Sequence, residues 1–266
     1  MKLQIFADKL KKSPIALLVA TILFLFSTFI TISQGFTVVR DYYVSTIGYK
    51  KELLKQISGL NAGVHIDNFK NIFGTPLFVN GTLIKEYIFV NNYFYLQAIT
   101  DSSGTILAYS ITIREKNFNP QIDLGPYTSN NISKKIILGE TTYLGLADFS
   151  DPNEIFSYVG AHNYHYTEGY YFGNPGKYQT FFFSTNESGY NKEDHTDLLP
   201  LNSNDATISN SKIKEFRSEE TINTYTVTAP LVDKEDLNLR GYIFYNYDND
   251  DGFLLGPSYN QVRVLD

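Results

Sequence analysis

Two histidines and a glutamate in the second half of the chain have the residue types and spacing of a metal site: His162, His165 and Glu168. In a helix, residues three apart share a face, so the three side chains would converge on one ion. In a strand, His162 and His165 would point to opposite faces instead. The segment follows Gly160 and is rich in tyrosine and asparagine. Packed or hydrogen-bonded histidines are therefore the preferred interpretation, a metal-dependent hydrolase is the alternative, and we predict no cofactor.

Two further polar clusters lack the partners that their chemistry requires. His195 lies between Asp194 and Asp197, but no serine occurs in the G-x-S-x-G setting of a hydrolase nucleophile. The run Asp248–Gly252 has the carboxylates of a calcium loop, but without the glycine and glutamate that an EF-hand places at its sixth and twelfth positions. A polar hairpin turn explains this run. We therefore predict no catalytic residues.

Five tyrosines on or beside the expected strands are the candidates for a binding surface: Tyr93, Tyr95, Tyr170, Tyr171 and Tyr178. Side chains alternate between the two faces of a strand, so some of these rings point inward and others outward. An outward set would form a tyrosine-rich surface for a peptide or a glycan. The alternative interpretation is a set of core residues and ordinary cross-strand pairs.

Composition limits the classes of protein to which the chain can belong. A length of 266 residues allows a sizeable core. The net charge of -6 argues against a nucleic-acid partner, because such proteins carry a basic patch. Cysteine is absent, which excludes disulfides, thiolate metal sites and a cysteine nucleophile. The 21 tyrosines and 20 phenylalanines favour strands, whose half-buried surfaces suit large flat side chains.

The N-terminal region contains an apolar segment. Residues 13–39 carry no charge, and 14–32 are about nineteen mainly apolar residues, or roughly 28 Å of helix. A cleaved signal peptide is the alternative, but its apolar region would be shorter and would end in small residues. We predict a transmembrane anchor over 13–39, preceded by a cytoplasmic segment over 1–12.

Basic residues on either side of this segment predict its orientation. Four lysines precede it, whereas Arg40, Lys50 and Lys51 follow it closely. The positive-inside rule then favours a cytoplasmic N-terminus. The expected location is a bacterial inner membrane, with the C-terminal domain periplasmic or extracellular. Ser27 and Thr28 are small enough to allow self-association through the span.

Apolar spacing predicts two helices and then three strands in the first half of the chain. Helical spacing runs over 47–60 and over 66–73, where Gly74 suits a left-handed cap and Pro76 prevents continuation. Asn-Asn and Ser-Ser-Gly turns separate the strand candidates, which are 85–90, 93–100 and 105–114. The predicted fold class is therefore α+β, with helices followed by an antiparallel meander.

A similar unit follows in the second half. Residues 168–179 parallel 86–97, and the polar turn 186–189 parallels 101–104. The distance from a helix-ending glycine to the turn glycine is 30 residues in the first copy and 29 in the second. We predict two tandem helix-plus-antiparallel-sheet units, at 40–118 and 136–266, joined by a linker at 119–135. The second unit would contain a polar surface loop at 185–218.

The stretch Gly63–Pro76 carries a family resemblance. Its helix ending in Gly-x-Pro resembles the fold shared by the outer-membrane assembly lipoprotein BamE and the β-lactamase inhibitor protein, the latter with two tandem copies. The resemblance covers 63–114 and extends loosely over 150–190. The whole chain also resembles a group of uncharacterised bacterial single-pass membrane proteins. The fold resemblance implies binding rather than catalysis.

These observations lead to one preferred function and two alternatives. The preferred function is a membrane-anchored, extracytoplasmic, non-catalytic protein that binds an envelope protein or a peptide, with the membrane as a further partner through 13–39. The first alternative is a cytoplasm-facing membrane effector or sensor. The second is the metal-dependent hydrolase around His162 and His165.

Overall fold

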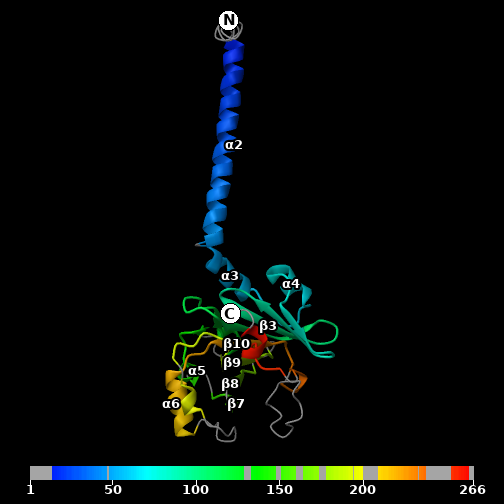
Figure 1. Ribbon diagram of the computed structural model, residues 1–266, viewed down its shortest axis with the longest axis vertical. Helices are drawn as coiled ribbons and strands as arrows, with labels where there is room; N and C mark the ends of the chain where they lie inside the picture. Colours follow the sequence, from blue (N-terminus) through cyan, green and yellow to red (C-terminus); the bar gives the residue numbers. More distant parts are fainter. Residues whose placement is uncertain are drawn as a thin grey trace. The chain divides into compact units, whose positions relative to one another are not determined.

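The computed structural model divides the chain into two compact units, Met1–Lys55 and Gln56–Asp266. Figure 1 shows their elements in chain order. Of the predicted features, the cytoplasmic segment 1–12, His162, Asp194 and the polar run 248–252 lie outside the described residues. The described residues are 14–46, 48–128, 133–147, 151–159, 164–173, 178–193, 195–199, 209–232, 234–237 and 253–263.

The first unit contains α2 (Pro14–Thr46), a continuous helix of 33 residues, and the start of α3 (Tyr49–Ser58). A membrane span needs about 20 consecutive apolar residues. Among the described residues, no helix combines the length and the apolar character that crossing a bilayer requires. This finding lends no support to the transmembrane anchor predicted over 13–39, which stays a prediction.

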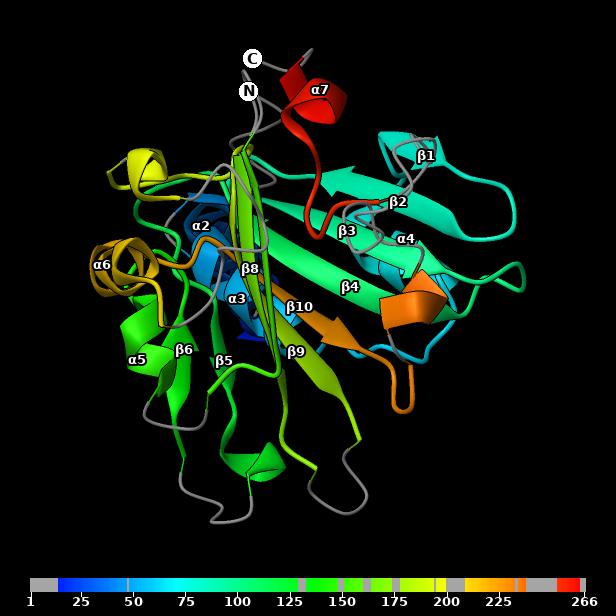
Figure 2. The same cartoon turned by 90° about the horizontal axis from the view of Figure 1, so that it is seen from below.

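The second unit is built on one large antiparallel sheet, which confirms the α+β class (Figures 1 and 2). Its strands lie in the order β1-β2-β3-β4-β10-β9-β8-β7. A separate ribbon pairs β5 (Gln121–Asp123) with β6 (Lys135–Ile137). The strands of the large sheet are β1 (Phe78–Asn80), β2 (Lys85–Val90), β3 (Phe94–Thr100), β4 (Ile106–Ile113), β7 (Glu154–Val159), β8 (Tyr164–Tyr171), β9 (Thr180–Asn186) and β10 (Thr224–Thr228).

The two faces of this sheet differ in chemistry because side chains alternate along each strand. One face, here called the aromatic face, carries buried rings and aliphatic groups, among them Tyr109, Ile111, Phe181, Phe183, Tyr225 and Val227. The other, the polar face, carries buried hydroxyls that bond to one another. Ser110 and Thr226 lie 2.7 Å apart through their hydroxyl oxygens, and Thr224 donates to Thr112 at 2.8 Å.

Short helices cover the aromatic face. Phe69 of α4 (Asp67–Phe73) meets Tyr109 edge-on, with ring centroids 5.7 Å apart. Phe216 of α6 (Ser211–Glu219) packs at 4.8 Å from Tyr166 and at 5.8 Å from Tyr143 of α5 (Tyr143–Ala147). The remaining short helices are η1 (Gly125–Tyr127), η2 (Thr196–Leu198), η4 (Lys234–Leu237) and α7 (Tyr259–Val262).

The C-terminal segment 253–263 covers part of the polar face. Phe253 and Leu255 pack in one cluster with Ile99, Ala108 and Phe182, which lie on three different strands. The burial of these apolar groups fixes the segment to the sheet. The last described residues therefore complete the core of the second unit.

The first half of the sheet follows the sequence closely. α4 ends where predicted, and Gly74 has a φ of +83°, the left-handed conformation that glycine adopts without a Cβ clash. β2, β3 and β4 agree with the predicted strands to within one residue at each end. Local sequence signals were sufficient to predict these elements, because the helix cap, the turn residues and the alternation of apolar residues all indicate the same structure.

Two predictions for the second half were wrong. The second unit was predicted to have a helix ending at Gly160, but residues 155–159 belong to the strand β7. Its apolar residues have helical spacing, but pairing with β8 along its whole length overrides that spacing. The helix α6 begins inside the stretch 185–218 predicted as a polar loop and ends one residue beyond it. Its signals were Asn210, whose side chain caps the helix by accepting from the amide of Lys212, and the buried pair Ile213 and Phe216.

The two turns compared by sequence have the same hydrogen-bonding pattern. In each, the first side chain accepts from the amide and hydroxyl of a serine two residues later: Asp101 from Ser103, and Asn186 from Ser188. Gly104 and Gly189 close the turns by donating to the carbonyls of Asp101 and Asn186. The existence of two tandem units stays a prediction, to which these matching turns lend support.

Candidate functional site

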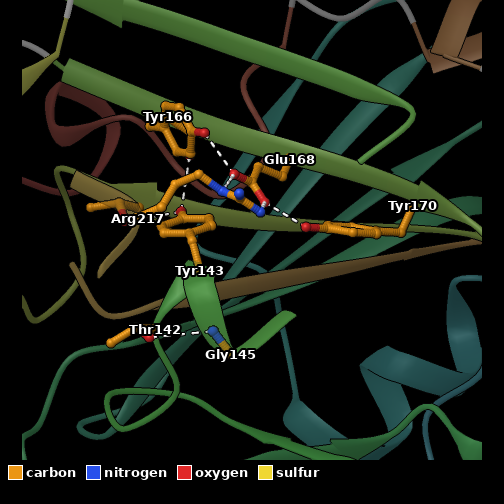
Figure 3. Close-up of polar contacts among 8 residues, drawn as sticks. Thr142, Tyr143, Gly145, Tyr166, Glu168, Tyr170 and Arg217 are labelled. Atoms are coloured by element: carbon orange, nitrogen blue, oxygen red, sulfur yellow. Dashed lines mark hydrogen bonds and ion pairs between the residues drawn. The ribbon is translucent and has the colours of Figure 1, made fainter. Parts of the chain in front are cut away.

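The most strongly charged cluster inside the second unit joins β8 to α6 (Figure 3). Nε of Arg217 donates to Oε1 of Glu168 at 2.6 Å, and Nη2 donates to Oε2 at 3.3 Å. The hydroxyls of Tyr166 and Tyr170 donate to the same carboxylate at 2.6 and 2.5 Å. All four side chains are buried. The carboxylate thus receives four donors from within the protein.

Burial dominates the electrostatics of this cluster. Desolvation raises the pKa of Glu168, and the Arg217 guanidinium and the two tyrosine donors oppose that rise. The pKa of Tyr143, close to the cluster, is also raised by burial. Its hydroxyl lies 3.0 Å from that of Thr185. Because both oxygens of the Glu168 carboxylate accept from donors within the protein, we interpret the cluster as a structural ion pair that fixes α6 to the sheet.

The structure separates the two described members of the predicted metal trio. His165 and Glu168 lie three residues apart on β8, so they point to opposite faces of the sheet. Nε2 of His165 lies 2.7 Å from the hydroxyl of Thr167, on the polar face, whereas Glu168 is bonded to Arg217 on the aromatic face. No group of three potential ligands converges among the residues that the structure describes.

His165 is buried and neutral. Burial lowers the pKa of His165 to about 4. Its Nδ1 is buried without a hydrogen-bond partner among the described residues. Its ring lies 6.1 Å from that of Phe156 between centroids. These features are those of a packed histidine, the interpretation preferred from the sequence.

The five candidate tyrosines do not form one surface. Tyr95 and Tyr170 are buried, the first beneath the guanidinium of Arg114 and the second against Glu168. Tyr93 is half-buried and stacks at 5.4 Å on Phe118. Tyr171 and Tyr178 are the exposed members, at 45% and 39%.

Sequence reasoning missed a groove on the aromatic face. Its floor consists of Tyr109, Tyr225 and Val227 from the two central strands, β4 and β10. One wall is the segment 57–62, which begins at the last residues of α3 and continues beyond it. The other wall is formed by β5 and η1. The groove has a volume of about 320 Å³ and also includes the side chain of Gln179. It is large enough for one or two side chains of a ligand.

The floor contains a tyrosine whose hydroxyl has no hydrogen-bond partner among the described residues. Tyr225 is 2% exposed and lines the groove. Among the described residues nothing bonds to its hydroxyl, whereas that of the neighbouring Tyr109 donates to the Leu60 carbonyl at 3.3 Å. Burial raises the pKa of both phenols, so both stay protonated as donors. The groove therefore offers a ligand one hydroxyl donor.

Only a weak signal for this groove exists in the sequence. β5 and η1 lie within 119–135, the stretch predicted to be a linker. Alternation places Tyr109 and Tyr225 on one face of their strands, but it does not make β4 and β10 neighbours. The two strands lie about a hundred positions apart in the chain, so only the structure shows that they are adjacent in the sheet.

Comparisons with known proteins give only weak likenesses. No family model and no curated protein matches the chain. A cysteine-rich secretory protein from Staphylococcus aureus aligns over 68% of this chain and 47% of its own length, at 11% identity and a TM-score of 0.36. A protein from Streptococcus mutans provisionally assigned as a β-lactamase inhibitor protein aligns over 49% of this chain and 80% of its own, at 15% identity and a TM-score of 0.19. The second has a provisional assignment to one of the proteins whose fold the Gly-x-Pro pattern resembles, but at these scores neither likeness carries an argument here.

Proposed function

We propose that the second unit is a non-catalytic binding domain and that the groove over Tyr109 and Tyr225 is its binding site. The observation that carries this proposal is Tyr225, which lines the groove and whose hydroxyl has no hydrogen-bond partner among the described residues. A ligand acceptor that reaches this hydroxyl would gain a hydrogen bond with a net value of about 0.5–1.5 kcal/mol. The groove thus combines an aromatic floor that carries two hydroxyls with walls of mixed aliphatic and polar residues, and small binding sites commonly combine apolar linings with a few polar groups.

The buried titratable side chains of the sheet support binding rather than catalysis. Glu168 is bonded to Arg217 and two tyrosines, and Glu86 accepts from Gln97 and Gln261. A general acid or base must reach the proton that it transfers. Both carboxylates instead accept hydrogen bonds from donors within the protein, Glu168 on the aromatic face and Glu86 on the polar face.

Ligand-observed NMR on the full chain would test this proposal. The probes are N-acetylated amino-acid amides, which carry a carbonyl acceptor with one side chain each. We expect saturation transfer to at least one probe, a weaker transfer with Tyr225→Phe, and an unchanged transfer with the matched control Tyr171→Phe. Equal signals from all three proteins, or the absence of any binding probe, would contradict the proposal.

We also propose that the second unit lies outside the cytoplasm. The support is the excess of lysine before the segment 13–39, and it rests on the sequence-based prediction that this segment is a membrane anchor. A cytoplasm-facing effector is the alternative. Alkaline phosphatase and a fluorescent protein fused separately to the C-terminus distinguish the two. Phosphatase activity would support the proposal, and fluorescence alone would overturn it in favour of the effector.

A further inference from the structure

The strand β5 has an open edge. It pairs with β6 alone, with Gln121 opposite Ile137, Ile122 opposite Ile136 and Asp123 opposite Lys135. Just outside the paired residues, the amide of Leu124 donates to the Lys134 carbonyl and that of Leu138 donates to the Pro120 carbonyl. Hydrogen-bonded pairs alternate along an antiparallel ladder, so Ile122 is the residue that bonds to β6. The amides and carbonyls of Gln121 and Asp123 therefore point the other way.

This open edge borders the groove. All three residues of β5 line the groove, whereas β6 contributes only Lys135. Among the described residues, no backbone hydrogen bond reaches the outward groups of Gln121 and Asp123. A row of free donors and acceptors beside a groove is the arrangement that receives an added strand.

The side chain that commonly protects such an edge is turned away. Asp123 accepts from the amides of Gly125 at 2.9 Å and Lys134 at 3.2 Å, and from the hydroxyl of Ser133 at 2.8 Å. These hydrogen bonds lower the pKa of Asp123, and the bond from the Gly125 amide has the largest effect. The carboxylate is therefore held in the loop between β5 and β6, and it does not block the approach of another strand.

We propose that an extended peptide segment of a partner protein adds to the outer edge of β5 and inserts one side chain onto the groove floor. The proposal rests on the groove being the binding site. A strand fits because its side chains alternate, so that every second one points to Tyr109 and Tyr225 while the backbone bonds to Gln121 and Asp123.

The floor indicates which side chain the peptide inserts. Tyr225 provides a donor. Nε2 of Gln179 donates to the Thr228 carbonyl at 3.1 Å. The Oε1 atom of Gln179 is therefore the atom of this side chain that would accept a hydrogen bond from a ligand. A carboxamide has both an acceptor oxygen and donor hydrogens. The inserted residue is therefore asparagine or glutamine.

The test begins with random octapeptides displayed on phage and selected against the full chain. The best peptide is synthesised, its affinity is measured by calorimetry, and each backbone nitrogen is methylated in turn. N-methylation should weaken binding at every second position only, because alternate amides face β5. We expect asparagine or glutamine at one position, and about a tenfold loss with Tyr225→Phe.

Gln121→Pro is the variant that tests the edge itself. It removes an amide that points away from β6, so pairing with β6 is retained and the circular dichroism spectrum should not change. It should weaken the peptide about tenfold, whereas Tyr171→Phe should leave the affinity unchanged. If Gln121→Pro changes the spectrum as well as the affinity, Gln121→Ala decides the question. This variant keeps the backbone amide and should bind the peptide normally.

Two outcomes would overturn the strand proposal. One is a selection that yields no binding peptide. The other is a peptide whose affinity is insensitive to Gln121→Pro or shows no alternation on methylation. If single amino-acid amides still bind in a Tyr225-dependent manner, the groove remains the binding site and only the peptide is wrong. If they do not bind either, the proposed function fails as well.

Discussion

The two halves of the sheet each bury a glutamate, and they satisfy it in different ways. Glu86 lies on β2 at 1% exposure and Glu168 lies on β8 at 0%. Glu86 accepts from two neutral amides, those of Gln97 at 2.5 Å and Gln261 at 2.6 Å. Glu168 instead has a cation, Arg217, at 2.6 Å.

The two carboxylates contribute to the fold in different ways. An amide pair offers hydrogen bonds without neutralising charge, so burial raises the pKa of Glu86 with only these two bonds opposing it. A guanidinium offers both, which suits a group that must stay ionised. The first glutamate ties the C-terminal segment to the sheet through Gln261, and the second ties α6 to the sheet through Arg217. In both cases a polar contact fixes the position of a covering element.

Removal of the cation should have the largest effect. Arg217→Met leaves Glu168 buried without its counter-ion, and the free energy of unfolding should fall by about 3–5 kcal/mol at neutral pH. Chemical denaturation measures this loss. Lys214→Met, at an exposed position of the same helix, is the control and should change stability by less than about 0.5 kcal/mol.

The Arg217→Met loss should also depend on pH. As pH falls, Glu168 takes up a proton, and a neutral carboxyl no longer needs the cation. The loss should therefore shrink in acid. A loss that is equally large at acidic and neutral pH would show that packing, not charge, is what Arg217 provides.

Replacement of the shared amide should have an intermediate effect. Gln97 donates to Glu86 and to the Leu254 carbonyl, and its own oxygen accepts from the amide of Gly256 at 2.7 Å. Gln97→Leu leaves these buried groups unpaired and should cost about 1–3 kcal/mol. Hydrogen exchange should report faster exchange at Gly256. Unchanged protection there would mean that apolar packing alone holds the C-terminal segment.

The pH profile of Glu86→Gln should show the smallest difference. The pKa of Glu86 is raised from 4.5 by burial, so the folded state binds a proton that the unfolded state has lost. Wild-type stability should therefore decrease as pH rises above 4.5, and this decrease should be weaker in the variant. Denaturation at several pH values measures both slopes. Parallel profiles would show that Glu86 titrates alike in both states.

Sequence reasoning succeeded where structure depends on near neighbours. The hairpin from β2 to β3 turns at Asn91, whose amide donates to the carbonyl of Phe94, and its register follows from alternation on either side. It failed at β7, where pairing with another strand overrode a helical spacing, and at α6, whose short apolar stripe lies in a polar stretch. The speculative metal site depended on a helix, and the strand β8 separates His165 from Glu168.

The sequence by itself determined the local elements of the first half, because caps, turns and alternation act over a few residues. Only the tertiary structure decided which strands meet. Glu168 and Arg217 lie 49 residues apart in the chain, and Tyr109 and Tyr225 come together because β4 lies beside β10. The groove, its open edge and both buried carboxylates exist because of that strand order. Strand order is set by the burial of whole faces, a property that no short segment carries.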